Sequence, residues 1–345
     1  MSNKGAVIGV DIGGTKTQLG QRRGARLDVF SRFPTPQDPD EAVAGIAEAI
    51  TEEGGAGGGS RAPGAVGIGC PGPLDQERGL VLSPPNLPQW HSFPLAERLG
   101  RACRCPVFLE NDANAGALGE ALFGSGKGCE KVFYVTISTG IGAGIVLDGR
   151  IYRGHAGMAG ELWAFRPELF APREAGSPRV GAANGNILDL ASGAGIVRRV
   201  ERLLEDEPAD SSGVVPERVG QDEADRDDPV SAAARDFFPD GRVSSEAVFD
   251  AYERGYPPIV EIVESAQRIL SAAAVFVLTT LAPDVIVLGG GLCREPGWYV
   301  RPIQRLVRES VPMEELRSVP IVRARLWDTA VLHGALSLAE TSGGR

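Results

Sequence analysis

The chain carries the same glycine-rich element twice, each time between runs of apolar, β-branched residues that predict buried strands. The first copy is residues 7–20 (VIGVDIGGTKTQLG) and the second is residues 132–149 (VFYVTISTGIGAGIVLDG). In both copies a strand enters a turn of Gly, Thr or Ser and a second strand leaves it, which predicts a hairpin. The repeat indicates two related lobes and constrains the fold more than either copy alone.

The chemistry of these turns points to phosphate. Glycines let backbone N–H groups approach an anion closely, and the hydroxyls of Thr15 and Thr139 add donors, so two facing hairpins can hold a polyphosphate from both sides. Asp11 ends a strand beside the first turn, where a carboxylate and phosphate are compatible only with a cation between them. Neither copy is a Walker A loop or a dinucleotide fingerprint. For either copy alone, a purely structural hairpin stays an alternative.

Length and charge set outer limits. With 345 residues the chain exceeds the usual size of a single core, so two domains are expected, and 43% hydrophobic residues suffice to bury them. A formal net charge of -10 argues against a nucleic-acid partner, which requires a basic surface. Any bound phosphate must therefore be held locally, by Lys16, backbone amides and metal.

The cysteines and apolar runs predict a cytoplasmic protein without a membrane partner. The five cysteines are scattered and odd in number, as is typical of reduced thiols. Cys103 and Cys105 form a lone CxC that lacks a second cysteine pair to complete a metal site. The apolar run 6–10 is too short for a signal peptide, and the run 269–281 is shorter than the ~20 residues that a membrane span requires.

Strand and helix patterns alternate along the chain, which predicts an α/β protein. We expect a first domain of residues 1–118, joined by a terminal helix at about 328–345, and a second domain of residues 119–327. Residues 205–240 form an acidic, proline-containing segment for which we expect no functional role. The expected helices are 39–51, 94–100, 113–123, 258–281 and 329–339, and strands outside the hairpins are expected at 65–69, 107–109 and 285–288.

Asn111 and Asp112 lie where a strand ends and a helix begins. Either side chain can cap the helix. Ligands of α/β sheets bind at the carboxyl ends of strands, and a carboxylate there can accept a proton from an attacking hydroxyl. If Asn111 is the cap, Asp112 is free to act as a base.

The ordered motifs DIGGTKT, PGP, NLPQW, ENDANA, STGIGAGIV, AGEL and VIVLGGG resemble the ROK family of sugar kinases and repressors. This resemblance implies a two-lobed actin-like ATPase fold of the ribonuclease H-like type, with a mixed sheet in each lobe. It also implies that ATP and a hexose bind between the lobes, and that the protein is a homodimer. The implied nucleotide contacts are Gly13, Gly14, Thr15 and Lys16 at the terminal phosphates, Thr139, Gly140 and Gly142 in a second phosphate loop, and Gly289, Gly290 and Gly291 beside the adenosine.

The same resemblance implies a sugar site. Its residues are Asn86, Asn111, Asp112 and Glu161, whose side chains suit a ring of hydroxyls. Asp112 is implied as the general base for the hydroxyl at carbon six, with Mg²⁺ held by Asp11 through water. His155 lies close to Glu161 in the sequence, either as a ligand contact or as a turn residue.

The chain departs from the family after AGE. Family kinases continue with Gly-His and a cysteine-rich zinc loop, but here Ala164 stands at the histidine position, Asn186 at a cysteine and Leu188 at a sugar-contacting glutamate. We therefore expect no zinc. Asp189 is expected to point elsewhere. Trp163 either stacks on a sugar or is buried.

Three functions stay open. The first is an ATP-dependent hexose kinase, most similar to a glucokinase. The second is a phosphotransferase that uses polyphosphate or accepts another hydroxylated ligand. The third is a silent, sugar-responsive regulator, against which the six residues before the first predicted strand leave no room for a helix-turn-helix DNA reader.

Overall fold

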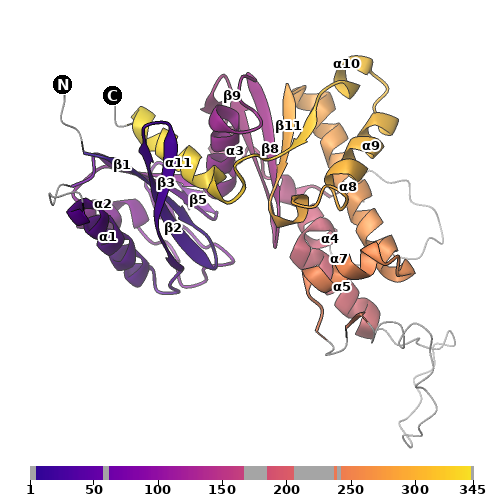
Figure 1. Cartoon of the computed structure of the whole chain (residues 1–345), viewed down its shortest axis with the longest axis horizontal. Coiled ribbons are helices and arrows are strands. Elements are labelled where there is room, and N and C mark those ends of the chain that lie inside the picture. Colours follow the sequence, from indigo (N-terminus) through magenta and orange to yellow (C-terminus); the bar gives the residue numbers. More distant parts are fainter. Residues whose placement is uncertain (1–4, 57–61, 167–184, 206–236, 239–241, 343–345) are drawn as a thin grey trace, which may run out of the picture.

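A computed structural model describes residues 5–56, 62–166, 185–205, 237–238 and 242–342, so most of the acidic segment 205–240 lies outside the described residues. Each half of the chain forms a mixed β-sheet with helices, and two helices lie between the two sheets (Figure 1). This arrangement is the α/β architecture that the alternating pattern predicted.

The first sheet has the order β3-β2-β1-β4-β7. β1 (Val7–Ile12), β2 (Lys16–Arg23) and β3 (Arg26–Pro34) are antiparallel, whereas β4 (Ala65–Cys70) and β7 (Val107–Asn111) run parallel to β1. Every residue of β4 is buried, as its central place requires. The short β5 (Leu74–Asp75) and β6 (Leu80–Val81) pair with each other. Two helices complete this core, α1 (Pro39–Ala56) and α2 (Leu95–Cys103).

The second sheet repeats this plan with the order β10-β9-β8-β11-β12. β8 (Lys131–Ile137), β9 (Ile141–Leu147) and β10 (Arg150–Ile151) are antiparallel, and β11 (Val285–Gly289) and β12 (Ile321–Arg323) run parallel to β8. Both predicted glycine hairpins, β1–β2 and β8–β9, are therefore confirmed at equivalent places. The described helices of this lobe are α4 (Ile187–Ala191), α5 (Gly193–Glu205), α7 (Ser245–Glu253), α8 (Pro257–Leu281), α9 (Val300–Ser310) and α10 (Glu314–Arg317).

The lobes meet at α3 (Asp112–Phe123) and α11 (Ala330–Ser342), which cross at glycines. A Cβ on Gly119 would lie 2.1 Å from the Ala330 carbonyl oxygen, and one on Gly334 would lie 1.8 Å from that of Ala115. Only glycine permits this approach. α3 follows β7 but packs on β8 and β9, whereas α11 follows β12 but packs on β1 and β4, so each helix connects both lobes.

α8 begins at Pro257, one residue before the expected helix 258–281, and includes the apolar run 269–281. By length and composition it is, within the described ranges, the one helix apolar enough to cross a membrane, and half of its most apolar window is buried inside the protein. Its residues Ile259, Val263 and Leu270 belong to the core of the second lobe. That burial accounts for its composition.

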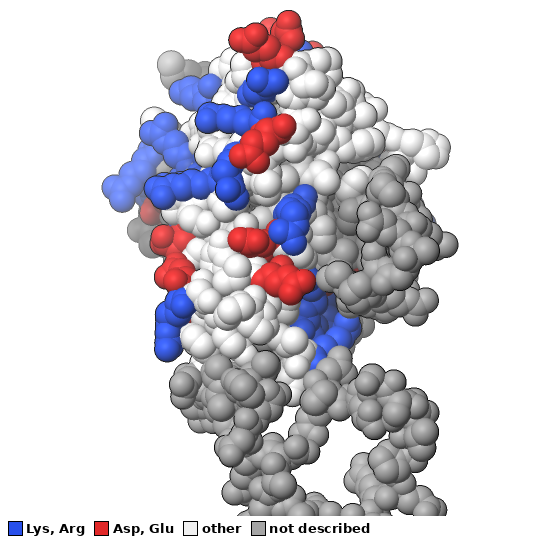
Figure 2. Space-filling model, turned by 90° about the vertical axis from the view of Figure 1, so that its right-hand side faces the viewer, with Lys and Arg blue, Asp and Glu red and all other residues white. Residues whose placement is uncertain are grey.

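The outer face of the second lobe carries both signs of charge, with Lys and Arg gathered toward its upper part in Figure 2. α9 contributes to this pattern because its sequence is amphipathic: Ile303 and Val307 are buried, whereas Arg301, Arg305 and Arg308 are exposed.

Candidate active site

The β1–β2 turn is held by hydrogen bonds that occupy its carbonyl groups. The Gly13 amide donates to the Lys16 carbonyl at 2.9 Å, and Thr35 donates its amide to the Thr15 carbonyl at 3.0 Å and its hydroxyl to the Gly13 carbonyl at 2.7 Å. Thr15 and Lys16 are exposed. The turn therefore presents hydrogen-bond donors and the Lys16 ammonium group to solvent, which is the polarity that phosphate requires.

Asp11 lies beside this turn at the end of β1. Its Oδ2 accepts from the Gln18 amide at 2.8 Å, and Gln18 also donates to the Asp328 carbonyl before α11. Burial raises the pKa of Asp11 to about 7, the Gln18 hydrogen bond opposes this rise, and the charge of Asp112 adds to it. An ionised Asp11 therefore favours a nearby cation.

The β8–β9 turn mirrors the first and is fastened from a different side. The Ser138 amide donates to the Gly140 carbonyl at 2.9 Å, and the Gly193 and Ala194 amides at the start of α5 donate to the carbonyls of Ser138 and Thr139. Thr139 is exposed. A Cβ on Gly142 would lie 3.0 Å from the Ala113 Cβ, so this hairpin packs on the first turn of α3.

The third glycine cluster lies against the end of β8. Gly289 pairs with Thr136, and Gly290 has φ +84°, a conformation in which a Cβ would be 2.3 Å from the Ile137 carbonyl oxygen. Gly291 borders open space. This cluster and the second hairpin therefore form one side of the site.

At the β7–α3 junction, Asn111 is the N-cap, and its Oδ1 accepts from the amides of Ala113 and Asn114 at 3.0 and 3.3 Å. Asp112 is the first helical residue, and its Oδ1 accepts from the Ala113 amide at 2.8 Å. Burial raises the pKa of Asp112, the amide bonds oppose this rise, and the charge of Glu161 adds to it. The capping role thus falls to Asn111 and leaves the second oxygen of Asp112 for other chemistry.

The two remaining predicted sugar residues lie on loops. Asn86 touches the first turn, since a Cβ on Gly14 would be 2.8 Å from the Asn86 Cβ. Glu161 is exposed, and its Oε2 accepts from the Trp163 indole N–H. The expectation of a buried Trp163 is wrong: the residue is 41% exposed, and its indole N–H donates to the exposed Glu161. His155 lies in an exposed 3₁₀ turn, His155–Gly157.

The departures from the family pattern have local consequences. Asn186 caps α4, and Asp189 is paired with Arg198 at 3.1 Å. Leu188 lies beside the second turn, with its Cδ1 3.7 Å from the position of a Cβ on Gly140. Among the residues that the structure describes, no three His, Cys, Asp or Glu side chains are grouped as metal ligands.

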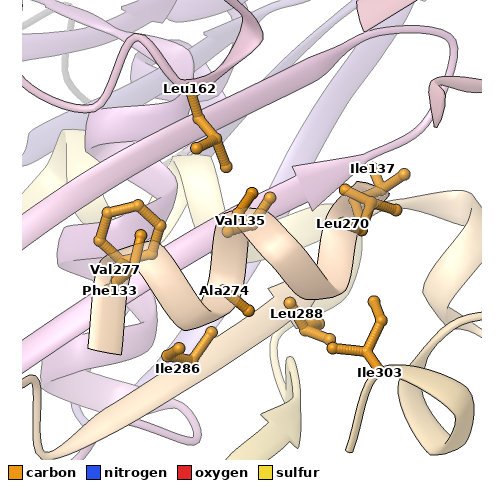
Figure 3. A pocket seen from close by; sticks show the side chains of 11 residues that line it. Phe133, Val135, Ile137, Leu162, Leu270, Ala274, Val277, Ile286, Leu288 and Ile303 are labelled. Atoms are coloured by element: carbon orange, nitrogen blue, oxygen red, sulfur yellow. The ribbon is translucent and has the colours of Figure 1, made fainter. Parts of the chain in front are cut away.

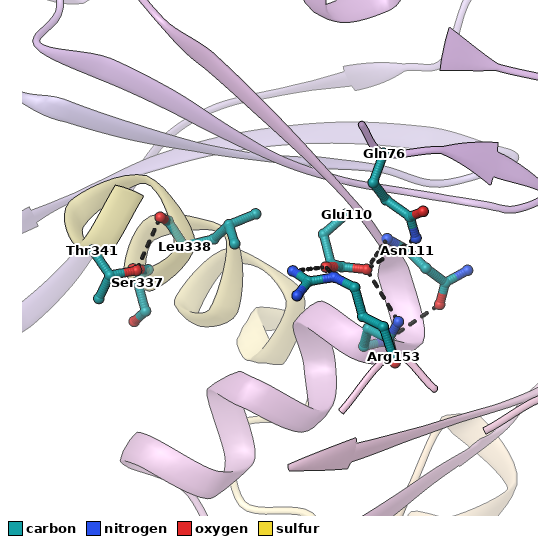
Figure 4. A network of polar contacts seen from close by, with 8 residues as sticks. Gln76, Glu110, Asn111, Arg153, Ser337, Leu338 and Thr341 are labelled. Carbon is teal, nitrogen blue, oxygen red and sulfur yellow. Dashed lines mark hydrogen bonds and ion pairs between the residues drawn. The ribbon is translucent and has the colours of Figure 1, made fainter. Parts of the chain in front are cut away.

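Sequence reasoning missed the most enclosed polar group of this region, Glu110. It is 0% exposed at the end of β7 and is paired with Arg153, which follows β10 (Figure 4). It also missed Gln18, which holds Asp11. The sequence signal for Glu110 is an acidic residue, the first of the ENDANA motif, inside a strand whose other residues are expected to be buried.

An apolar cavity of about 20 Å³ lies elsewhere, between the second sheet and helices α8 and α9 (Figure 3). Its lining includes Phe133, Leu162, Leu270 and Ile286, and all of its side chains are hydrocarbon. Such a space offers no polar partner to a sugar or a phosphate. The candidate site is therefore the polar region around Asp11 and Asp112.

Residues 7–342 match the family model described as ROK family. The chain belongs to the ROK family. A glucokinase from Streptomyces coelicolor is 32% identical over 97% of this chain and 98% of its own. The ROK hexokinase structure from Thermus thermophilus is 30% identical, covers 98% of both chains and has a TM-score of 0.74. A ROK family glucokinase from Streptomyces griseus in complex with glucose and AMPPNP is 27% identical, covers 98% of this chain and 100% of its own, and has a TM-score of 0.71.

Membership in the ROK family explains the duplicated sheets. The fold is the two-lobed actin-like ATPase fold, with a mixed sheet in each lobe, as the resemblance implied. The ordered motifs include both hairpin turns, the end of β7 and the end of β11, which is why they are spread over the whole chain.

Proposed function

We propose that this ROK protein is an ATP-dependent sugar kinase that transfers the γ-phosphoryl group of ATP to the 6-hydroxyl of glucose or a related hexose. The observation that carries the proposal is the junction at Asp112. A carboxyl group with a raised pKa lies at the start of α3, the hinge helix between the two lobes. It is next to the second glycine hairpin and within electrostatic reach of Asp11. Glucokinase relatives that match nearly the whole chain support the same reaction.

On the phosphate side, the proposed contacts divide between the two hairpins. Gly13, Gly14, Thr15 and Lys16 bind the terminal phosphates, and Thr139, Gly140 and Gly142 bind from the second lobe. Gly289, Gly290 and Gly291 border the adenosine. Exposed amides and hydroxyls on fixed turns are suited to this task because their carbonyl oxygens are already hydrogen-bonded.

Magnesium fits at Asp11. Burial makes ionisation of this carboxyl unfavourable unless a cation is near. Its Oδ2 accepts from the neutral side-chain amide of Gln18, and the proposed phosphate-binding turn adjoins it. We propose that Asp11 holds Mg²⁺ through water. When bound, the ion neutralises phosphate charge, which is the main demand of phosphoryl transfer on a protein.

On the sugar side, Asn86, Asn111 and Glu161 orient the hexose. Since Asn111 uses Oδ1 as the helix cap, its amide nitrogen remains as a donor. Asp112 is the proposed general base. The Ala113 amide fixes one of its oxygens, and the other accepts the proton of the hydroxyl as that oxygen attacks phosphorus. Burial strengthens this base by making its neutral form favourable.

We propose that residues 1–118 and the terminal helix move as one unit against residues 119–327. The homodimer and the cytoplasmic location also stay predictions. Sedimentation of the purified protein tests the dimer. Small-angle scattering with and without hexose tests the division, because closure of two rigid units lowers the radius of gyration.

The function is tested by a coupled ADP-release assay over a panel of hexoses, with phosphorus NMR to identify the phosphorylated position. We expect turnover with glucose or a close relative and a 6-phosphate product. The panel includes polyphosphate as an alternative donor. Absence of turnover with every hexose and both donors refutes a kinase, and hexose binding without turnover then identifies a sugar-responsive regulator.

A further inference from the structure

Glu110 is the acid most completely enclosed beside the candidate site. Its Oε2 accepts from Arg153 Nε at 2.9 Å and from Arg153 Nη2 at 2.6 Å. Its Oε1 accepts from the Asn111 amide and the Asn114 side chain, both at 3.0 Å, and from Gln76 Nε2 at 3.4 Å. Figure 4 shows Gln76, Asn111 and Arg153 around the Glu110 carboxylate.

The partners come from separate parts of the fold. Glu110 belongs to β7 of the first sheet, Gln76 follows β5, and Asn114 is on the hinge helix α3. Arg153 follows β10 of the second sheet. The ion pair therefore joins the two lobes immediately before Asn111 and Asp112.

Arg153 also begins the segment that ends at Glu161. The Ala159 amide donates to the Arg153 carbonyl at 2.9 Å, which closes the segment into a compact loop. A Cβ on Gly157 would lie 3.3 Å from Gln76 Oε1, and one on Gly160 would lie 2.7 Å from the Ala143 carbonyl oxygen. These distances show that the loop is fitted closely between Gln76 and β9, and both glycines also have positive φ, which side chains rarely adopt.

We infer that the Glu110–Arg153 ion pair is a positioning element that sets the distance between the two halves of the sugar site. Glu110 fixes the Asn111–Asp112 backbone through the Asn111 amide, and Arg153 fixes the loop that presents Glu161. This inference rests on the proposed function of that site. Neither member touches the reacting atoms, so their effect on the sugar acts through Asn111, Asp112 and Glu161.

Energetics favour a positioning role over a stabilising one. Desolvating an ion pair costs about as much as its attraction returns, so apolar replacements of a buried pair are often neutral or stabilising. Geometry is what the pair adds, because a two-nitrogen contact from one guanidinium fixes both direction and distance. The Arg153 side chain is 43% exposed, so it reaches Glu110 from the solvent side.

The test uses Arg153→Gln, Arg153→Lys and the double variant Glu110→Gln/Arg153→Gln. The matched control is Arg98→Gln, which removes an exposed pair with Asp40 away from the site. For each full-length protein, steady-state kinetics give KM for hexose and for ATP, calorimetry gives glucose affinity, and urea unfolding gives stability. We expect Arg153→Gln to raise the hexose KM at least about tenfold with the ATP KM within about twofold.

Stability and positioning then separate in the double variant. Arg153→Gln leaves a buried carboxylate without its partner and lowers the urea midpoint, whereas the double variant removes that charge and recovers stability. We expect its hexose KM to stay high. Arg153→Lys keeps the charge but loses the two-nitrogen geometry, so an intermediate hexose KM is expected. Arg98→Gln leaves all constants unchanged.

A hexose KM that returns to the wild-type value together with stability in the double variant overturns the inference, since the pair is then only structural. An equal rise in both KM values overturns it too. If the wild-type protein binds glucose but does not phosphorylate any hexose, the proposed function fails while the calorimetric comparison still decides the role of the pair. A wild-type protein that neither binds nor phosphorylates a hexose overturns both.

Discussion

The two sheets share one topology but differ at the third strand and in the segment after it. In the first lobe β3 (Arg26–Pro34) is nine residues long and completes the sheet edge. In the second lobe β10 (Arg150–Ile151) ends after two residues, and the chain returns toward the first lobe with Arg153 and Glu161. Shortening one strand of a duplicated fold therefore frees a segment that carries side chains to the candidate sugar site.

The turns differ as well. The first contains Lys16 and follows Asp11, whereas at the equivalent place the second has Thr136 before a turn without charge. One turn therefore carries a carboxylate and an ammonium group, whereas the other carries only amides and hydroxyls. The two hairpins share a topology but differ in charge.

The sharpest test of this asymmetry compares the starts of the two crossing helices. Asp112→Asn removes the proposed base at the start of α3, and we expect kcat to fall about 10³-fold, because a general base contributes roughly 10²–10⁴-fold. Nucleotide affinity should persist. Single-turnover kinetics and a titration with an ATP analogue measure the two effects.

The control is Asp328→Asn, just before α11, where the carboxylate is exposed and paired with Arg294 at 2.7 Å. A change of less than about threefold is expected, since exposed pairs contribute little. A large residual rate in Asp112→Asn, or equal losses in both variants, removes Asp112 from its proposed role.

The helix crossing itself is symmetric, so it predicts equal effects. Gly119→Ala and Gly334→Ala each place a methyl group against a carbonyl oxygen of the other helix, at 2.1 and 1.8 Å in the unrelaxed backbone. Overpacking of this kind costs about 1–3 kcal/mol. Urea unfolding should show similar losses for both, whereas Gly45→Ala, with ordinary contacts to Phe33, should lose nothing. Unequal losses of stability would mean that the backbone of one helix shifts to accommodate the added methyl group more readily than the other.

The two crossing helices, α3 and α11, differ in one buried side chain at equivalent positions. Three residues after Ala115 is Leu118, and three residues after Ala330 is His333; both are buried. Burial, together with the charge of Arg22, whose Nη1 lies 3.4 Å from Nδ1, lowers the pKa of His333 to about 4. Histidine in the unfolded chain titrates near pH 6.5. Below that pH the unfolded state takes up a proton that the folded state refuses, so stability falls as the pH falls toward 4.

We expect His333 to cost on the order of 2 kcal/mol of stability between pH 7.5 and pH 5. His333→Leu, which makes α11 resemble α3, should reduce the acid-induced loss by that amount in urea unfolding at the two pH values. The variant must be compared with the wild-type protein at each pH, because Asp11 has a raised pKa in the folded protein. Its protonation increases stability as the pH falls, which opposes the effect of His333. An unchanged acid-induced loss would show that His333 is protonated in the folded protein.

Much of the fold was predictable because its signals are local. Alternating β-branched residues and glycines specify each hairpin within about 15 residues, and the cap Asn111 lies at a helix start that the sequence indicated. β3 was missed because its residues are mostly only partly buried and its alternation breaks at Phe30, where the pairing with β2 is irregular. α5 and α9 were missed although each buries one face, because charged residues fill the opposite face and make both segments polar on average.

The candidate site was predictable only where a motif is contiguous. Glu110 and Arg153 are 43 positions apart, and no local pattern links an acid in a strand to an arginine after a distant hairpin. Trp163 was expected to be buried from its residue type, but it lies at the surface in a short 3₁₀ turn, with its indole N–H on Glu161. Pairing across lobes depends on tertiary structure, which sequence periodicity does not encode.

The smallest expected effect comes from replacing one glycine by alanine in each of the two hairpin turns. Gly14→Ala would bring a methyl group to 2.8 Å from the Asn86 Cβ, so the loop that carries Asn86 must shift, whereas Gly140→Ala meets only Leu188 at an ordinary 3.7 Å. If Asn86 orients the hexose, Gly14→Ala raises the hexose KM about fivefold to tenfold. Gly140→Ala should leave the hexose KM within about twofold and act on the ATP KM instead. Initial-rate measurements with each substrate varied in turn decide between them, and a reversed pattern would assign the sugar to the second turn.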